Sequence, residues 1–255
     1  MTSWTALLLA GSRPGGDPLT QSLGCDYKPL LPIKGEPMLL RPIRALLAAP
    51  SIGTVRALTQ QIERLEAVLP DDPAVVVEQS QETIASTLVA ICRDPATRFP
   101  LLVTTADHAL LTPAMIEEFI AASTDCDIAV AFVESRSLLA RFPDAKRTWL
   151  RFGRKRYSGA NLFALTGPDV IVAIERWRAI EQDRKKGWRV LLQLGLPLFL
   201  GAVLRVRNLD QTAVGLSRKL GVVIKGVVMT DPIAAIDVDK PADYSLVNEI
   251  LDGRA

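Results

Sequence analysis

The chain has 255 residues, of which 49% are hydrophobic and 23% charged, with a formal net charge of +2 at pH 7. This length suits one large α/β domain or two small ones, and the hydrophobic content is ample for a sizeable core. The charge is too balanced to indicate a nucleic-acid-binding protein.

Histidine and cysteine usage excludes several kinds of site. His108 is the single histidine, so a histidine-rich metal site is excluded, and any catalysis by histidine must use this residue. Cys25, Cys92 and Cys126 lack a C-x-x-C spacing, which argues against a disulfide framework or a zinc cluster. The N-terminus shows no signal-peptide pattern. We therefore expect a protein of the reducing cytoplasm.

Short apolar runs alternate with helical patterns along the chain. This alternation predicts an α/β fold with a mostly parallel central sheet covered by helices on both faces. The predicted strands are residues 7–10, 54–59, 74–77, 101–104, 128–133, 162–165, 222–228 and 234–238. The predicted helices are residues 37–48, 61–69, 82–93, 113–122, 168–183, 189–204, 210–220 and 241–252. Because no repeat or linker interrupts them, we expect residues 1–255 to form a single domain.

The first predicted strand runs into a glycine-rich loop that suits a phosphate group. Glycines let backbone amides approach a ligand closely, and the cations Arg13 and Lys28 bracket the loop. Amides and fixed positive charge after a strand are the features of a triphosphate site. The residues expected to bind the nucleotide here are Leu9, Ala10, Gly11 and Ser12.

Two later predicted strands end in aspartates. Asp107 follows the strand at residues 101–104, and Asp237 ends the strand at residues 234–238. The carboxyl ends of parallel strands meet at one edge of the sheet, where ligands bind. One or two carboxylates together with substrate phosphates suffice for Mg²⁺. Asp239 is an alternative ligand, although helix capping is the favoured role for both Asp239 and Asp243.

The segments around the glycine-rich loop resemble a known family. Residues 9–13 (LAGSR) and 28–39 (KPLLPIKGEPML) look like the signature of nucleoside triphosphate transferases with a GT-A-type fold, nearest to the MobA-like, molybdenum-cofactor guanylyltransferase-like proteins. The resemblance implies a Rossmann-like three-layer sandwich and a loop that wraps the nucleotide phosphates. It also implies that Arg13 and Lys28 stabilise the leaving pyrophosphate.

The same resemblance assigns further roles. Asp107 and Asp237 match the family's metal-binding positions, which implies a Mg²⁺ cofactor. The segment that reads nucleobase and ribose in relatives matches the one containing Gln79, Ser80 and Thr87. A G-x-N segment that faces the acceptor in relatives matches Gly159 and Asn161. His108 is interpreted as a contact to the acceptor or as a structural residue.

Residues 176–229 are the part least like the family. Within them, residues 189–204 are strongly apolar but too short to span a bilayer, which takes about 20 residues. Three interpretations stay open: a core helix, a contact in a homodimer, and an interfacial helix that touches the membrane peripherally. The last interpretation prompts the hypothesis of a hydrophobic or lipid-precursor acceptor.

These patterns favour a Mg²⁺-dependent nucleotidyltransferase. It would transfer a nucleoside monophosphate from CTP or GTP to a phosphorylated small-molecule or lipid-precursor acceptor and release pyrophosphate. One alternative is a sugar-nucleotide-dependent glycosyltransferase of the same fold, although Asp125-Cys126-Asp127, its D-x-D candidate, precedes a strand instead of following one. A second alternative is a nucleotide-binding regulator without turnover. No nucleic-acid partner is expected.

Overall fold

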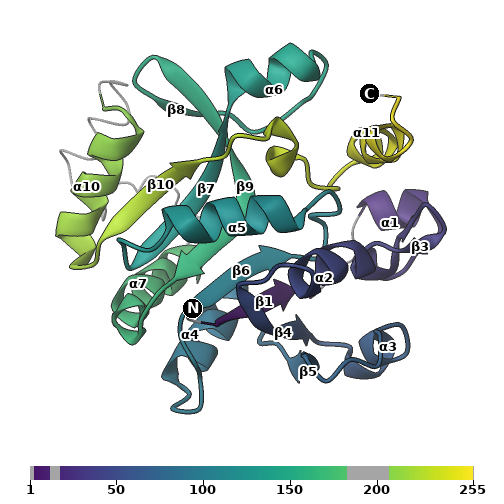
Figure 1. Ribbon diagram of the computed structural model, residues 1–255, viewed down its shortest axis with the longest axis horizontal. Coiled ribbons are helices and arrows are strands. Elements are labelled where there is room, and N and C mark those ends of the chain that lie inside the picture. Colours follow the sequence, from purple (N-terminus) through teal and green to yellow (C-terminus); the bar gives the residue numbers. More distant parts are fainter. Residues whose placement is uncertain (1–2, 12–17, 183–206, 255) are drawn as a thin grey trace.

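The structure is a computed structural model, and it describes residues 3–11, 18–182 and 207–254. Its main sheet has the strand order β10-β7-β9-β6-β1-β4-β5, with β8 paired to β9 (Figure 1). The strands are β1 (Trp4–Leu9), β4 (Ile52–Thr59), β5 (Val75–Gln79), β6 (Leu101–Thr105), β7 (Ile128–Glu134), β8 (Leu150–Phe152), β9 (Lys155–Leu165) and β10 (Ile224–Val228). A separate small ribbon pairs β2 (Pro32–Ile33) with β3 (Glu36–Pro37).

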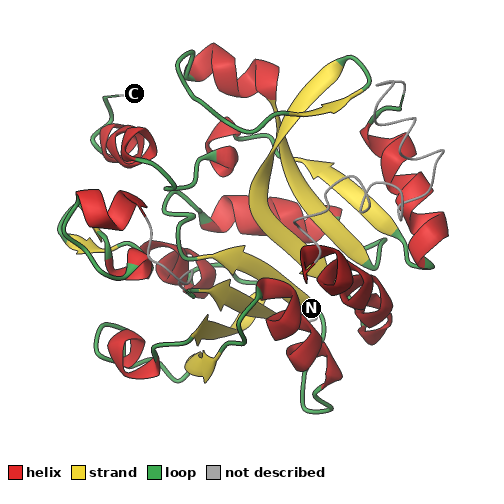
Figure 2. Cartoon of the chain, turned by 180° about the vertical axis from the view of Figure 1, so that it is seen from behind, coloured by secondary structure: helices red, strands yellow, loops and turns green. Residues whose placement is uncertain are grey.

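Helices cover both faces of this sheet. One hydrophobic cluster joins the sheet to the buried sides of α2 and α5, and a second joins its other face to α4 and α7. Figure 1 shows α2 and α5 in front of the sheet, and Figure 2 shows the opposite face from behind. The α-helices are α1 (Pro18–Ser22), α2 (Leu40–Leu47), α3 (Ile62–Glu66), α4 (Ile84–Arg93), α5 (Pro113–Ala122), α6 (Ser135–Arg141), α7 (Ile171–Gln182), α10 (Leu209–Leu220) and α11 (Pro241–Leu251). The predicted three-layer α/β sandwich is confirmed.

The sheet is mostly parallel, and β9 is the exception. β1 runs parallel to β4 and β6, whereas β9 runs antiparallel to both β6 and β7. The register between β7 and β9 shifts between Val130 and Phe132, and opposite this irregularity Asn161 adopts a left-handed φ of 47°. Asparagine tolerates this conformation better than most residues.

The largest error in the predicted elements is the strand at residues 234–238. Pro232–Ala235 forms a 3₁₀-helix, η4, whose first turn is capped when the Ile233 amide donates to Asp231 Oδ1 at 2.9 Å. Ala234, Ala235, Ile236 and Val238 are buried as an apolar strand would be. The short apolar run therefore predicted burial correctly but not backbone conformation. In so short a run, the pattern of apolar residues does not distinguish a strand from a helical turn.

Several other elements differ from the prediction in extent. The strand expected at residues 162–165 begins earlier, at Lys155, and its hairpin partner β8 was not predicted. Helix α6 was also missed. The helix expected at residues 189–204 lies outside the described residues. Among the helices that are described, none is both long and apolar enough to cross a membrane.

Candidate active site

Lys28 stands between two carboxylates at the carboxyl edge of the sheet. Its side chain leaves the short 3₁₀-helix η1 (Lys28–Leu30), and its Nζ lies 2.7 Å from Asp107 Oδ2 and 2.6 Å from Asp239 Oδ1. Burial alone would lower the pKa of the Lys28 ammonium, but the negative charges of Asp107 and Asp239 outweigh it and raise that pKa. Lys28 is therefore a fixed positive charge next to the end of β6.

Asp237 lies beside Asp107, although it comes from an irregular segment and not from a strand. The Val238 amide donates to the Asp107 carbonyl at 3.1 Å, which ties the two segments together. The Asp237 Oδ2 accepts from Asn161 Nδ2 at 3.0 Å. Burial raises the pKa of Asp237 to about 6, helped by the negative charges of Asp107 and Asp239. The structure thus brings both predicted metal ligands to one place.

Arg147 is a site residue that the sequence did not reveal. Its Nη1 lies 2.5 Å from Asp237 Oδ1 and its Nη2 lies 3.0 Å from Asp243 Oδ1, and its side chain is only 6% exposed. Residues 146–156 are rich in basic side chains. The arginines of the β8–β9 hairpin are exposed, whereas Arg147 is buried against partners about 90 residues further along the chain.

The two aspartates expected to cap a helix behave differently. Asp243 Oδ2 accepts from the backbone amides of Asp239 and Lys240, at 3.2 and 3.0 Å, at the start of α11. Its capping role is confirmed. The side chain of Asp239 instead pairs with Lys28. Lys28 and Arg147 therefore each bridge two carboxylates.

Only part of the expected phosphate loop is described. Leu9 ends β1, the Ala10 amide donates to the Leu58 carbonyl at 2.8 Å, and Ser12 and Arg13 lie outside the described residues. A Cβ on Gly11 would lie 2.9 Å from Gln60 Oε1, closer than real Cβ contacts come. Gly11 is exposed, and the end of the flexible Gln60 side chain lies against it.

A buried tyrosine anchors this region. The Tyr27 hydroxyl donates to the Ala10 carbonyl and lies 2.6 Å from Thr59 Oγ1. Burial is the main cause that raises the pKa of Tyr27, so its hydroxyl stays a donor at neutral pH. Tyr27 thereby links the end of β1 to Lys28, the next residue in the chain. The sequence alone gave no sign of this role.

The segment expected to read the base follows β5. Gln79 is the last residue of β5, and the Ser80 amide donates to the Thr59 carbonyl at 2.8 Å. The Ser80 hydroxyl is buried and has no hydrogen-bond partner among the described residues. Thr87 is buried, accepts from the Gln81 amide and donates to the Thr83 carbonyl, both at 2.9 Å. Thr87 thus stabilises the turn, and Ser80 keeps an unused hydroxyl.

The residues expected to face the acceptor are not brought together as a group. His108 is fully buried, with Nδ1 3.5 Å from Thr104 Oγ1, and burial lowers its pKa to about 4 against the opposing effect of Asp107. This placement fits the structural alternative for His108. Gly159 is exposed, and a Cβ there would meet open space. Asn161 is the member of this group that reaches the aspartates.

The carboxylates fit a cation that is shared with a phosphate. Within residues 3–11, 18–182 and 207–254, no group of three or more histidine, cysteine or acidic side chains is arranged to enclose a metal ion. Asp107 and Asp237 nevertheless supply hard oxygen donors close together. Mg²⁺ keeps several waters and binds through one or two carboxylates plus substrate phosphates. The pair suits that incomplete coordination and not a site formed by protein alone.

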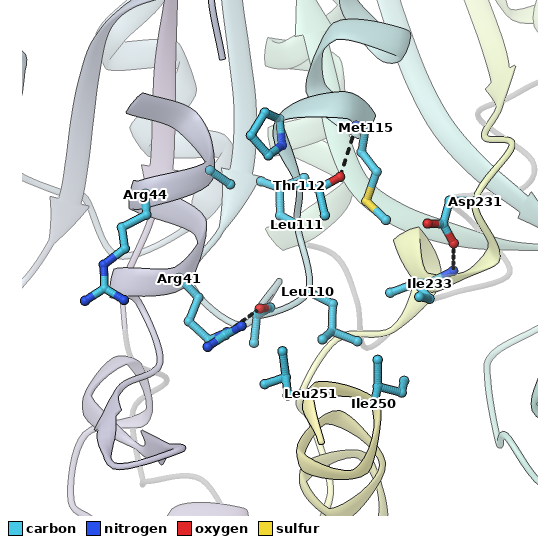
Figure 3. A pocket seen from close by; sticks show the side chains of 13 residues that line it. Arg41, Arg44, Leu110, Leu111, Thr112, Met115, Asp231, Ile233, Ile250 and Leu251 are labelled. Carbon is cyan, nitrogen blue, oxygen red and sulfur yellow. Dashed lines mark hydrogen bonds between the residues drawn. The ribbon is translucent and has the colours of Figure 1, made fainter. Parts of the chain in front are cut away.

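A cleft of about 430 Å³ lies apart from these residues, between α2, the start of α5 and α11 (Figure 3). Arg41 and Arg44 flank one side, and Arg41 Nε donates to the Ala109 carbonyl at 2.9 Å. The lining is otherwise largely apolar, with Leu110 and Ile250 among its members. None of the residues proposed for nucleotide or metal binding lines this cleft.

Comparisons with known proteins bear on the family and the fold. A family model described as a MobA-like NTP transferase domain matches residues 6–203. No curated protein sequence matches the chain.

Similar solved structures cover almost the whole chain. A hypothetical transferase from Thermus thermophilus has a TM-score of 0.79 and 23% identity, over 95% of this chain and 99% of that one. A 4-diphosphocytidyl-2C-methyl-D-erythritol synthase from Anaerococcus prevotii has a TM-score of 0.62 and 10% identity, over 98% and 96%. A CMP:2-keto-3-deoxy-manno-octonic acid synthetase complexed with CTP has a TM-score of 0.59 and 16% identity, over 99% and 100%. At these identities the likeness shows the fold.

Proposed function

The chain belongs to the MobA-like NTP transferase family, and on that premise we propose that it transfers a nucleoside monophosphate from CTP or GTP to a phosphorylated acceptor. Pyrophosphate is the second product, and Mg²⁺ is the cofactor. The observation that carries the proposal is the convergence of Lys28, Asp107 and Asp237 at the sheet edge where β1 also ends. Fixed positive charge beside two carboxylates is what a magnesium triphosphate needs.

In this proposal the loop after β1 and its cations hold the triphosphate. Gly11 offers a backbone without a side chain, and Lys28, next to the anchored Tyr27, supplies a protonated ammonium. Asp107 and Asp237 would hold Mg²⁺, which when bound neutralises charge on the phosphates. Since Lys28 now balances the charge of Asp107 and Asp239, a cation at Asp107 would leave its ammonium to donate to a phosphate oxygen.

The chemical step needs little covalent participation by the protein. An oxygen of the acceptor's ionised phosphate attacks the α-phosphorus and forms a new P–O bond. The bond from the α-phosphorus to the bridging oxygen breaks, and pyrophosphate leaves with that electron pair. Because the nucleophile is already ionised, no general base is required. Catalysis then comes from orientation and electrostatic stabilisation.

Two features support the choice of substrates. Among the similar structures, one is named for a diphosphocytidyl product and another contains CTP, which favours CTP as the donor nucleotide. The resemblance to molybdenum-cofactor guanylyltransferases makes GTP the second candidate donor. Exposed arginines, Arg151, Arg154 and Arg156, lie on the β8–β9 hairpin whose second strand carries Asn161. Positive charge there favours an anionic acceptor, either a small molecule or a lipid precursor.

The glycosyltransferase alternative has less support. Its D-x-D candidate precedes β7, at the opposite edge of the sheet from Asp107. There Asp125 pairs with Lys225 at 2.7 Å, and Asp127 Oδ2 accepts from the Val223 amide at 2.6 Å. These carboxylates therefore serve the packing of β10. The regulator without turnover differs from the transferase in releasing no pyrophosphate.

The test is pyrophosphate release from CTP, GTP, ATP and UTP with Mg²⁺ and a panel of phosphorylated acceptors that includes lipid precursors. Release with one nucleotide, lost in Lys28→Ala and Asp107→Ala, is the expected result. Lys225→Ala is the matched control, since it removes a lysine–aspartate pair at the other sheet edge. Mg²⁺-dependent nucleotide binding without release across the panel would favour the regulator.

A further inference from the structure

The buried guanidinium of Arg147 is committed to two aspartates. Its two Nη atoms reach Asp237 Oδ1 and Asp243 Oδ1, and both also lie 3.4 Å from the Asp237 carbonyl oxygen. The Arg147 and Asp243 side chains are 6% and 10% exposed. A charge withdrawn from water this far must be paired. The planar fork of donors suits arginine to bridging two carboxylates.

Asp237 depends on side chains for its orientation. It lies between η4 and α11, in a segment that belongs to no strand of the described chain. Arg147 donates to Oδ1 and Asn161 donates to Oδ2. Two donors from different directions fix the plane of the carboxylate. Each oxygen has two lone pairs and keeps one for a cation.

Asp243 holds Arg147 in turn. One Asp243 oxygen accepts from the amides of Asp239 and Lys240 at the start of α11, which leaves the other for Arg147. The buried Asp243 is therefore fixed to the helix itself. A continuous chain of contacts runs from the start of α11 through Asp243 and Arg147 to the carboxylate of Asp237.

We propose that Arg147 is a positioning residue that orients the Asp237 carboxylate for binding Mg²⁺ and the nucleotide phosphates, with Asp243 as its anchor. The inference rests on the proposed function, because it takes Asp237 as a ligand of the cation. Groups that orient metal ligands in this way typically change metal affinity 10- to 100-fold when they are replaced.

A role of Arg147 through its charge and a role through orienting Asp237 predict different effects on metal binding, so a measurement of metal affinity separates them. Mn²⁺ replaces Mg²⁺ as the probe, and its binding is measured by electron paramagnetic resonance with CTP and with GTP. Arg147→Lys keeps the positive charge but loses the two-armed fork, so orientation predicts about tenfold or greater weakening of Mn²⁺ binding. A role through charge alone predicts no change for Arg147→Lys. Losing a positive charge altogether would by itself strengthen cation binding.

Asp243→Asn is the second variant. Its oxygen can still cap α11, but its Nδ2 then faces Arg147 Nη2, donor against donor, so the bond to Arg147 is lost. We expect weaker Mn²⁺ binding here too, with less effect than in Arg147→Lys. Arg56→Lys is the matched control. Arg56 is a comparably buried arginine, 15% exposed, that donates with Nε and Nη2 to both oxygens of Glu78. It should lower Tm without changing Mn²⁺ affinity.

Wild-type affinity in both Arg147→Lys and Asp243→Asn would overturn the inference, as would an equal loss of affinity in Arg56→Lys. Failure of the wild-type protein to bind Mn²⁺ with either nucleotide would instead contradict the proposed function, and this inference with it. The two failures are distinguishable, because the second appears before any variant is made.

Discussion

Lys28 Nζ and Asp107 Oδ2, which belong to residues 79 positions apart, form an ion pair of 2.7 Å at the carboxyl edge of the sheet. The two side chains are 16% and 18% exposed, so water screens them only partly. The pair joins the loop after β1 to the end of β6. It places a permanent cation and a carboxylate at the position where a magnesium triphosphate would need both.

The first prediction concerns the coupling of this pair. Lys28→Ala leaves the partly buried Asp107 without its counter-ion, whereas Asp107→Ala leaves Lys28 still paired with Asp239. Each change should cost about 1–3 kcal/mol of unfolding free energy, with the smaller loss in Asp107→Ala. The double variant Lys28→Ala/Asp107→Ala should lose less than the sum of the two single losses, with a coupling of about 0.5–3 kcal/mol. Urea unfolding of the four proteins measures this, and strict additivity would show that the pair contributes nothing to stability.

The second prediction concerns the pH dependence contributed by Asp237. Its pKa is raised to about 6, so between about pH 4 and 6 the folded protein holds a proton that the unfolded chain has lost. Stability from this group therefore falls as pH rises through that window. The loss is on the order of 3 kcal/mol, since one pKa unit corresponds to about 1.4 kcal/mol. Asp237→Asn should remove this slope in urea unfolding at several pH values.

The third prediction concerns His108, which acts with the opposite sign. Burial lowers its pKa to about 4, so between about pH 4 and 6.5 the unfolded chain binds a proton that the folded protein does not. Its contribution to stability is lost as pH falls through that window. His108→Gln should flatten this acid destabilisation. An unchanged difference between pH 4.5 and 7 relative to wild type would contradict the buried neutral imidazole.

The fourth prediction concerns the anchor at Tyr27. Tyr27→Phe keeps the buried ring but leaves the Ala10 carbonyl and the Thr59 hydroxyl without that partner. We expect a loss of about 1–3 kcal/mol and weaker nucleotide binding. Tyr244→Phe is the control, because its hydroxyl donates to the Pro32 carbonyl, away from these residues. Equal effects of the two changes on nucleotide binding would contradict a local role for Tyr27.

The parts of the site that lie near one another in the sequence could be predicted from it. The glycine-rich loop and Lys28 follow one strand, and Asp107 directly follows another, so strand and turn signals suffice. Asp237 was placed at the correct edge although its predicted strand is a 3₁₀-helix, because the apolar residues before it are buried either way.

Other features depend on contacts that no local pattern encodes. Arg147 stands in a run of basic residues, and only its distant partners distinguish it from its solvated neighbours. The burial of His108 depends on tertiary packing, because a polar residue after a strand reads as solvent-facing. The left-handed Asn161, whose amide donates to Asp237, lies opposite a register shift between β7 and β9. Such shifts are set by the whole sheet.

The most direct measurement is equilibrium binding of CTP and GTP, with Mg²⁺ or with a chelator, to wild type, Asp107→Asn and Arg44→Ala. Our account predicts that wild type binds either CTP or GTP, but not both, and that this binding requires Mg²⁺. Asp107→Asn should weaken that binding strongly, and Arg44→Ala, in the cleft beside α2, should leave it unchanged. Nucleotide binding that survives Asp107→Asn, or that is lost in Arg44→Ala, would contradict the site at Lys28, Asp107 and Asp237.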